Sequence, residues 1–112
     1  IKSKALPIQC KLVEQAELLA EKQERLNLLK TILDEAINKR FSARIRFETQ
    51  GKNIKQAKKA EEVLMKNYET GTINFKDMLN IQELQLKFQM NQIESVKSYY
   101  VQTTIMNYLT QQ

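Results

Sequence analysis

The chain has 112 residues, a length that ordinarily forms one domain, and its formal net charge is +5. With two glycines, one proline, no tryptophan and few β-branched runs, the sequence argues against a sheet and predicts an all-α fold. The absence of histidine removes the commonest general base and metal ligand. Cys10 is the only cysteine, which excludes an internal disulfide, and we expect it to be a small buried apolar residue.

The start of the sequence predicts a short lead-in before the first helix. Residues 1–7 end at Pro7, and proline suits the first turn of a helix but not its interior. The chain begins with Ile1, shows no signal peptide and has no apolar run close to the about 18 residues that span a bilayer. We therefore expect an interior fragment of a longer protein.

From Ile8 onward the apolar residues follow helical spacing, which predicts a first helix over residues 8–69. Two heptad-like series form its seam: Leu12, Ala16, Leu19, Leu26, Leu29, Leu33 and Ala36, then Ala43, Phe47, Ile54, Ala57, Leu64 and Tyr68. The seam shifts near Ile37 and Phe41, which predicts a change of packing partner or supercoil there. Gly51 interrupts this helix at a cost of about 1 kcal/mol relative to alanine. A long packed helix absorbs that cost, so we expect one helix; a break at Gly51, giving a three-helix bundle, is the alternative.

Residues 70–74 predict a tight turn between two helices. Gly71 suits the position just past a helix end, because glycine adopts positive φ without a Cβ penalty. Asn74 is a good N-cap, and the Asp77 carboxylate, three residues on, can reach back to a free amide. Ile73 and Met78 then occupy the two positions of a hydrophobic staple. These signals predict an antiparallel helical hairpin with its tip at residues 70–74.

The return helix is expected over residues 75–110, with apolar residues on two faces. One face carries Phe75, Leu79, Leu86, Met90, Ile93, Val96 and Tyr100, and the roughly opposite one carries Ile81, Leu84, Phe88, Tyr99, Met106 and Leu109. Between them runs a polar strip of Lys76, Asn80, Glu83, Lys87, Glu94 and Ser98. One hairpin partner buries only one face, so the second predicts further helices from other parts of the chain or from other subunits.

Basic residues gather in the first helix. Residues 39–59 contain eight of them, opposed only by Glu48: Lys39, Arg40, Arg44, Arg46, Lys52, Lys55, Lys58 and Lys59. Such a belt suits phosphate, anionic lipid or an acidic partner, or is simply a solvated helix face. Tyr99, Tyr100 and Tyr108 lie on the other helix, which separates stacking groups from phosphate-binding groups and disfavours nucleic-acid binding.

No catalytic constellation is present in the sequence. It contains no glycine-rich phosphate loop, no metal-ligand cluster and no nucleophile paired with a base. Adjacent carboxylates, such as Asp34 with Glu35, point about 100° apart on a helix and are expected to be surface charges. We therefore expect a protein that is not an enzyme and needs no cofactor.

The tip and the return helix share a longer pattern: Tyr68-x-x-Gly71-Thr72-x-x-Phe75-x-Asp77-Met78-Leu79-Asn80, then Gln82, Leu84, Leu86, Gln89 and Tyr100. This pattern resembles the second periplasmic hairpin of TolC-like outer-membrane efflux proteins, and the resemblance covers roughly residues 12–109. It implies a long coiled-coil hairpin that forms part of a trimeric α-helical barrel in the parent protein, in the periplasm and outer membrane of a Gram-negative bacterium. Its partners would be a periplasmic adaptor protein and an inner-membrane pump.

The resemblance also implies roles for residues at the tip. Gly71, Thr72, Ile73 and Asn74 would form the surface that docks the adaptor. Tyr68, Asp77 and Asn80 would line the constricted periplasmic entrance. Asn80 stands where some members of the family carry a second aspartate, and Ile73 stands where the best-known member has a basic residue. A charged latch at that position is therefore not expected here.

The resulting expectation is a passive export conduit that moves what its pump delivers. One alternative is another coiled-coil interaction module, either a periplasmic adaptor hairpin or a cytoplasmic tether. A second alternative is a basic nucleic-acid-binding helical protein, whose affinity would fall steeply with salt and with neutralisation of Arg40, Arg44, Lys55 and Lys59.

Overall fold

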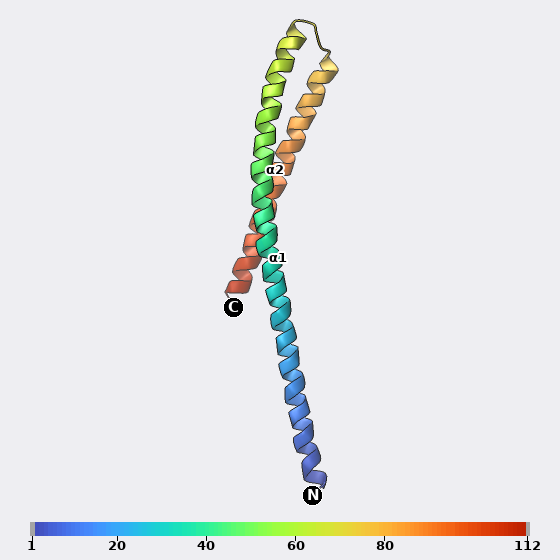
Figure 1. The fold of residues 1–112 in the computed structure, drawn as a ribbon, viewed down its shortest axis with the longest axis vertical. Coiled ribbons are helices and arrows are strands. Elements are labelled where there is room, and N and C mark those ends of the chain that lie inside the picture. Colours follow the sequence, from blue (N-terminus) through green and yellow to red (C-terminus); the bar gives the residue numbers. More distant parts are fainter. Residues whose placement is uncertain (1, 112) are drawn as a thin grey trace. The chain divides into compact units, whose positions relative to one another are not determined.

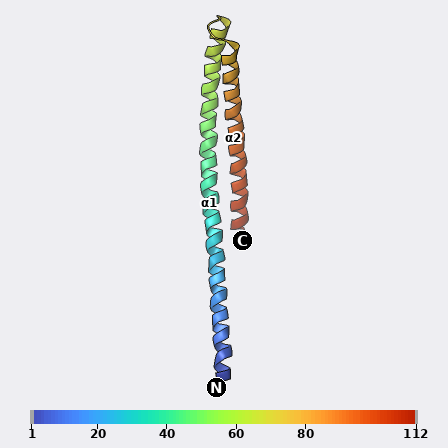
Figure 2. The same cartoon turned by 90° about the vertical axis from the view of Figure 1, so that its right-hand side faces the viewer.

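The computed structural model describes residues 2–111, with side chains from residue 7 onward. It is all-helical and contains α1, which spans Lys2–Glu69, and α2, which spans Phe75–Thr110. The end of α1 and both ends of α2 coincide with the bounds predicted from the sequence. The second half of α1 and α2 run side by side in opposite directions from the tip (Figures 1 and 2), which confirms the predicted helical hairpin.

The chain divides into two units, the first ending at Glu35 and the second beginning at Ala36. The first unit consists of the initial half of α1, in which every side chain from Pro7 to Ile32 is exposed. Its leucine series therefore has no partner among the described residues of that unit. The second unit, which is the hairpin, contains the core.

The hairpin core follows one uninterrupted heptad seam on each helix, which we call the inner seam. On α1 its most buried residues are Ala36, Ala43 and Ala57, at 2%, 0% and 4% exposure. On α2 a series of buried and half-buried residues advances in steps of three and four: Met78, Ile81, Gln85, Phe88, Gln92, Ser95, Tyr99, Gln102, Met106 and Leu109. This alternation is the spacing of a coiled coil, so the two helices pack through small and polar residues as well as apolar ones.

Polar side chains bridge the two helices at several levels. The Gln85 amide donates to the Glu61 carboxylate, and Gln92 Nε2 donates to the carbonyl oxygen of Phe47 over 3.4 Å. At another level Arg40 takes a seam position, with its guanidinium carbon 4.9 Å from the centre of the Tyr99 ring and its Nη1 3.8 Å from Met106 Sδ. Cation–π contact and the long alkyl stem of arginine account for a charged residue at this half-buried place.

The structure corrects the predicted start of the chain. Residues 2–7, expected as lead-in, are helical, and Pro7 lies inside α1 rather than in its first turn. Because proline has no N–H, this turn forms without one helical hydrogen bond. Residue 1 lies outside the described residues. Cys10, expected to be buried, is exposed, because nothing in the first unit covers this part of the helix.

The structure also tests two predictions about the middle of α1, a break at Gly51 and a shift of the seam. The helix continues through Gly51, so the three-helix alternative is not what the structure shows. The predicted shift of the seam near Ile37 and Phe41 is wrong: these residues are 44% and 65% exposed, and the inner seam passes from Ala36 to Ala43 through Arg40 without a change of spacing. A change of packing, predicted for the same place, is present, because the unit with a core begins at Ala36. The sequence suggested a shift because arginine is not an expected seam residue.

Candidate functional site

The tip is closed by a Schellman motif at the end of α1. The Thr72 N–H donates to the Asn67 carbonyl over 2.9 Å, and the Gly71 N–H donates to the Tyr68 carbonyl over 3.0 Å. Gly71 has φ +78°, and it is the only positive-φ residue within residues 2–111. The predicted role of Gly71 as the helix-terminating residue is thereby confirmed, since a side chain at this φ is strained.

Two threonine hydroxyls add to this closure. Thr70 Oγ1 and Thr72 Oγ1 donate to the same Asn67 carbonyl oxygen over 2.9 and 2.8 Å. The carbonyls at a helix end otherwise lack partners, so these bonds fix the turn without help from outside the tip. The Thr70, Gly71 and Thr72 side of the turn nevertheless remains exposed. The tip is therefore an exposed surface of defined shape.

A capping box begins α2, as predicted. Asn74 Oδ1 accepts from the Asp77 N–H over 3.1 Å, and Asp77 Oδ2 accepts from the Asn74 N–H over 3.4 Å. Met78 is 4% exposed and Ile73 is half-buried, as the two ends of a hydrophobic staple should be. The residues predicted for docking thus also build the turn.

The residues predicted to line an entrance lie next to the tip on both helices. Tyr68 packs on Phe75 with ring centres 6.3 Å apart, a contact that links the end of α1 to the start of α2. Asp77 and Asn80 are exposed on the first turns of α2. The Tyr68–Phe75 contact was not predicted, although an aromatic residue on each side of a short turn is a signal for it.

A second series on α2, which we call the outer stripe, is largely exposed; at its start Phe75 contacts Tyr68. It contains the seven residues of one predicted face: Phe75, Leu79, Leu86, Met90, Ile93, Val96 and Tyr100. Val96 is half-buried, and the exposure of the others runs from 41% at Leu79 to 68% at Ile93. As expected, the hairpin buries only one of the two apolar faces of α2.

Four residues of the outer stripe have the same heptad spacing as the inner seam, displaced by one residue along α2. Leu79, Leu86, Ile93 and Tyr100 each directly follow an inner-seam residue and are themselves spaced by seven. Successive residues on an α-helix point about 100° apart, so α2 carries two heptad seams in two directions. A helix with two such seams is suited to pack on two neighbouring helices at once.

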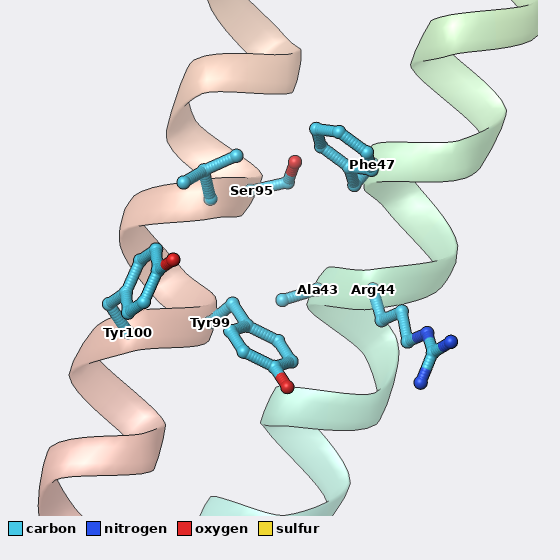
Figure 3. Close-up of a pocket in the computed structure, with 7 residues that line it drawn as sticks. Ala43, Arg44, Phe47, Ser95, Tyr99 and Tyr100 are labelled. Atoms are coloured by element: carbon cyan, nitrogen blue, oxygen red, sulfur yellow. The ribbon is translucent and has the colours of Figure 1, made fainter.

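A hollow of about 210 Å³ opens between the helices beside the outer stripe. Its lining includes Ala43 and Ser95, both 0% exposed, together with Phe47, Val96 and Tyr100. Ser95 Oγ donates to the Gln92 carbonyl over 2.6 Å, so its hydroxyl is satisfied within α2. Figure 3 shows the Phe47 and Tyr99 rings in the space between the helices, whereas the Arg44 guanidinium points away from α2. The two small residues leave room that a side chain from outside the hairpin can fill.

The basic belt is largely unneutralised. Among residues 7–111 one ion pair is present, between Arg44 Nε and Glu48 Oε1 at 3.7 Å, and its side chains are 71% and 62% exposed. A pair this exposed adds little stability. From Gly51 to Ala60 there are four lysines and no acidic residue: Lys52, Lys55, Lys58 and Lys59. All four lysines, named here the lysine run, are exposed.

Other kinds of site are not found in the described part of the chain. The described residues contain no group of three or more His, Cys, Asp or Glu side chains placed to hold a metal ion. Neither described helix combines the length and apolar character needed to cross a membrane. Comparisons with protein families, with curated proteins and with solved structures find no match for this chain.

Proposed function

We propose that this chain is part of the helical wall of an outer-membrane efflux duct of the TolC-like kind, with the tip as the docking surface for a periplasmic adaptor of a tripartite pump. The observation that carries the proposal is the pair of seams on α2. A closed wall of helices requires each helix to pack on two neighbours, and the inner seam and the outer stripe offer both contacts. In the parent protein the wall is a homotrimer, and the duct is a passive conduit that performs no chemistry.

The polar strip supports a water-filled interior. Asn80, Lys87 and Glu94 are exposed and lie on neither seam of α2. In a wall whose helices pack through both seams, this third direction remains in contact with water. The strip therefore suits the lining of a channel for polar cargo.

The tip supports a docking role because its shape does not depend on a partner. Its Schellman motif, threonine bonds and capping box are internal, while Thr70, Gly71, Thr72 and Asn74 stay exposed. A rigid, exposed turn binds with little loss of conformational entropy. Tyr68, Asp77 and Asn80, one or two turns from the tip, would line the entrance of the duct.

The proposal is tested with two substitutions at the tip of the parent protein. Gly71→Val strains the turn, since a β-branched residue does not tolerate φ +78°, and we expect adaptor cross-linking at the tip and efflux of a fluorescent substrate to fall together. Gly71→Asn is the matched control, because asparagine tolerates positive φ, and it should keep both activities. Full efflux with Gly71→Val at normal protein levels in the outer membrane would contradict the docking role.

A further inference from the structure

The outer stripe of α2 and one side of α1 form a single face of the hairpin. Arg44 of α1 and Val96 and Tyr100 of α2 line the same hollow, so these parts of the two helices face the same way. Lys58 lies two heptads after Arg44 on α1, and Lys55 lies three residues before Lys58. Residues three, four and seven apart share a helix side, so both lysines belong to this face.

Two contacts set the level of the lysine run along α2. A Cβ at Gly51 would lie 3.3 Å from Gln92 Nε2, and Glu61 is hydrogen-bonded to Gln85. Residues 52–60 of α1 therefore lie beside residues 86–91 of α2. That stretch contains Leu86 and Met90, which are 57% and 56% exposed. At this level the outer stripe has a basic border on its α1 side.

From this geometry we infer that the outer stripe binds an amphipathic helix with an apolar heptad seam and an acidic edge, the edge lying over the lysine run. The apolar residues spaced by seven fix the spacing of the partner's seam. The hollow over Ala43 and Ser95 takes one of its larger apolar side chains. Acidic residues on the edge above Lys55 and Lys58 neutralise charges that this chain leaves without ion pairs within residues 7–111.

The charges also bear on the identity of the helix. A second copy of the hairpin laid on the outer stripe would bring the lysine run of its own α1 onto the same face, and like charges at close range oppose association. On that face Glu48 is already paired with Arg44. Beside Leu86 and Met90, α2 itself carries Glu83, Lys87 and Glu94, a border of mixed sign. A helix with a uniformly acidic edge therefore fits the lysine run better than α2 of another copy. The inference concerns the neighbour of α2 and holds whether or not the parent protein is a duct.

The test uses the 112-residue chain and two synthetic helical peptides of about four heptads. Both peptides carry the same leucine seam, and they differ only in having glutamate or lysine along one edge. We expect the glutamate peptide to bind at least about tenfold more tightly in fluorescence anisotropy, and the difference to shrink as NaCl rises from about 0.1 M to about 0.5 M. Equal affinities at low salt would overturn the inference.

Paired variants locate the binding surface. Leu86→Ser with Ile93→Ser should abolish binding of the glutamate peptide. Leu84→Ser, at a leucine that is 41% exposed and lies outside the outer stripe, should leave it unchanged. Lys55→Glu with Lys58→Glu should reverse the preference between the peptides. Lys39→Glu with Arg46→Glu, the same charge change elsewhere on α1, should not reverse it, and circular dichroism checks that each variant is folded.

Sedimentation of the chain without peptide tests whether a second copy of the chain, and not an acidic helix, covers the outer stripe. If the chain sediments as a monomer, or as an oligomer that dissociates when the glutamate peptide is added, the result supports the inference. A dimer that resists the peptide and is lost in the Leu86→Ser, Ile93→Ser variant shows that a second copy covers the outer stripe, and it overturns the inference.

Discussion

The two glycines of this chain occupy opposite kinds of position. Gly71 has φ +78° and no heavy atom within 4 Å of where a Cβ would stand, so its requirement is conformational and not steric. Gly51 has ordinary helical geometry, and a Cβ there would meet the Gln92 side-chain amide at 3.3 Å. That amide is the end of a flexible side chain and can move by a few tenths of an ångström. The same substitution should therefore have opposite effects at the two glycines.

We expect Gly51→Ala to raise the free energy of unfolding by up to about 1 kcal/mol, because alanine has the higher helix propensity. Gly71→Ala should lower it by about 1–2 kcal/mol, because alanine is strained at positive φ. Urea denaturation followed by circular dichroism measures both changes. A loss of stability with Gly51→Ala would mean that the Gln92 contact with the Phe47 carbonyl cannot readjust.

At the scale of the helices, the inner seam is unusually polar for a coiled coil. Arg40, Gln50 and Glu61 lie along it on α1, and Gln85, Gln92, Ser95 and Gln102 lie along it on α2. Most of these groups have partners, but Gln50 Oε1 is buried with no hydrogen-bond partner. A buried acceptor without a partner costs about 1–3 kcal/mol. The hairpin is therefore held less tightly than an apolar seam of equal length would hold it.

Replacing Gln50 with leucine should raise the free energy of unfolding by about 1 kcal/mol or more, since it removes the unpaired oxygen and adds apolar surface to the seam. Gln56→Leu, at an exposed position of the same helix, is the control and should change stability by less than about 0.5 kcal/mol. The midpoints of thermal unfolding give the comparison. Equal effects of the two substitutions would show that Gln50 is not buried in solution.

At the scale of the whole molecule, the two units differ in what stabilises them. The hairpin has a core, whereas residues 7–32 have no buried side chain. A single helix in water is marginally stable, because most helix stability in proteins comes from packing. The first unit should therefore contribute little to the stability of the chain. Its exposed leucine series, like the outer stripe, is an apolar surface suited to bind another helix.

Deleting residues 1–35 should leave the urea midpoint of the hairpin unchanged. Hydrogen exchange on the intact chain should show fast exchange over residues 7–32 and slower exchange along the inner seam of residues 36–109. If the deletion clearly lowers the midpoint, the first unit packs against the hairpin or against another copy of the chain in solution. Sedimentation would then show whether the chain forms an oligomer.

The local features of this protein follow from the residue types alone: the helix bounds at Glu69 and Phe75, the positive φ of Gly71, and the capping box of Asn74 and Asp77. These depend on hydrogen bonds between residues at most five apart, so the residue types at those places are sufficient to predict them.

Which face of α2 packs on α1 does not follow from the residue types and is seen only in the folded hairpin. The face with Phe88 and Tyr99 does so, together with Gln85, Gln92 and Ser95, while the more apolar outer stripe remains exposed. Only contacts between residues far apart in the chain, such as Phe47 with Gln92, distinguish the two faces. The physical reason is that either face satisfies the period of a helix, so periodicity cannot choose between them. The face that packs on α1 brings the small Ser95 close to the small Ala43 and gives Gln85 and Gln92 hydrogen-bond partners on α1.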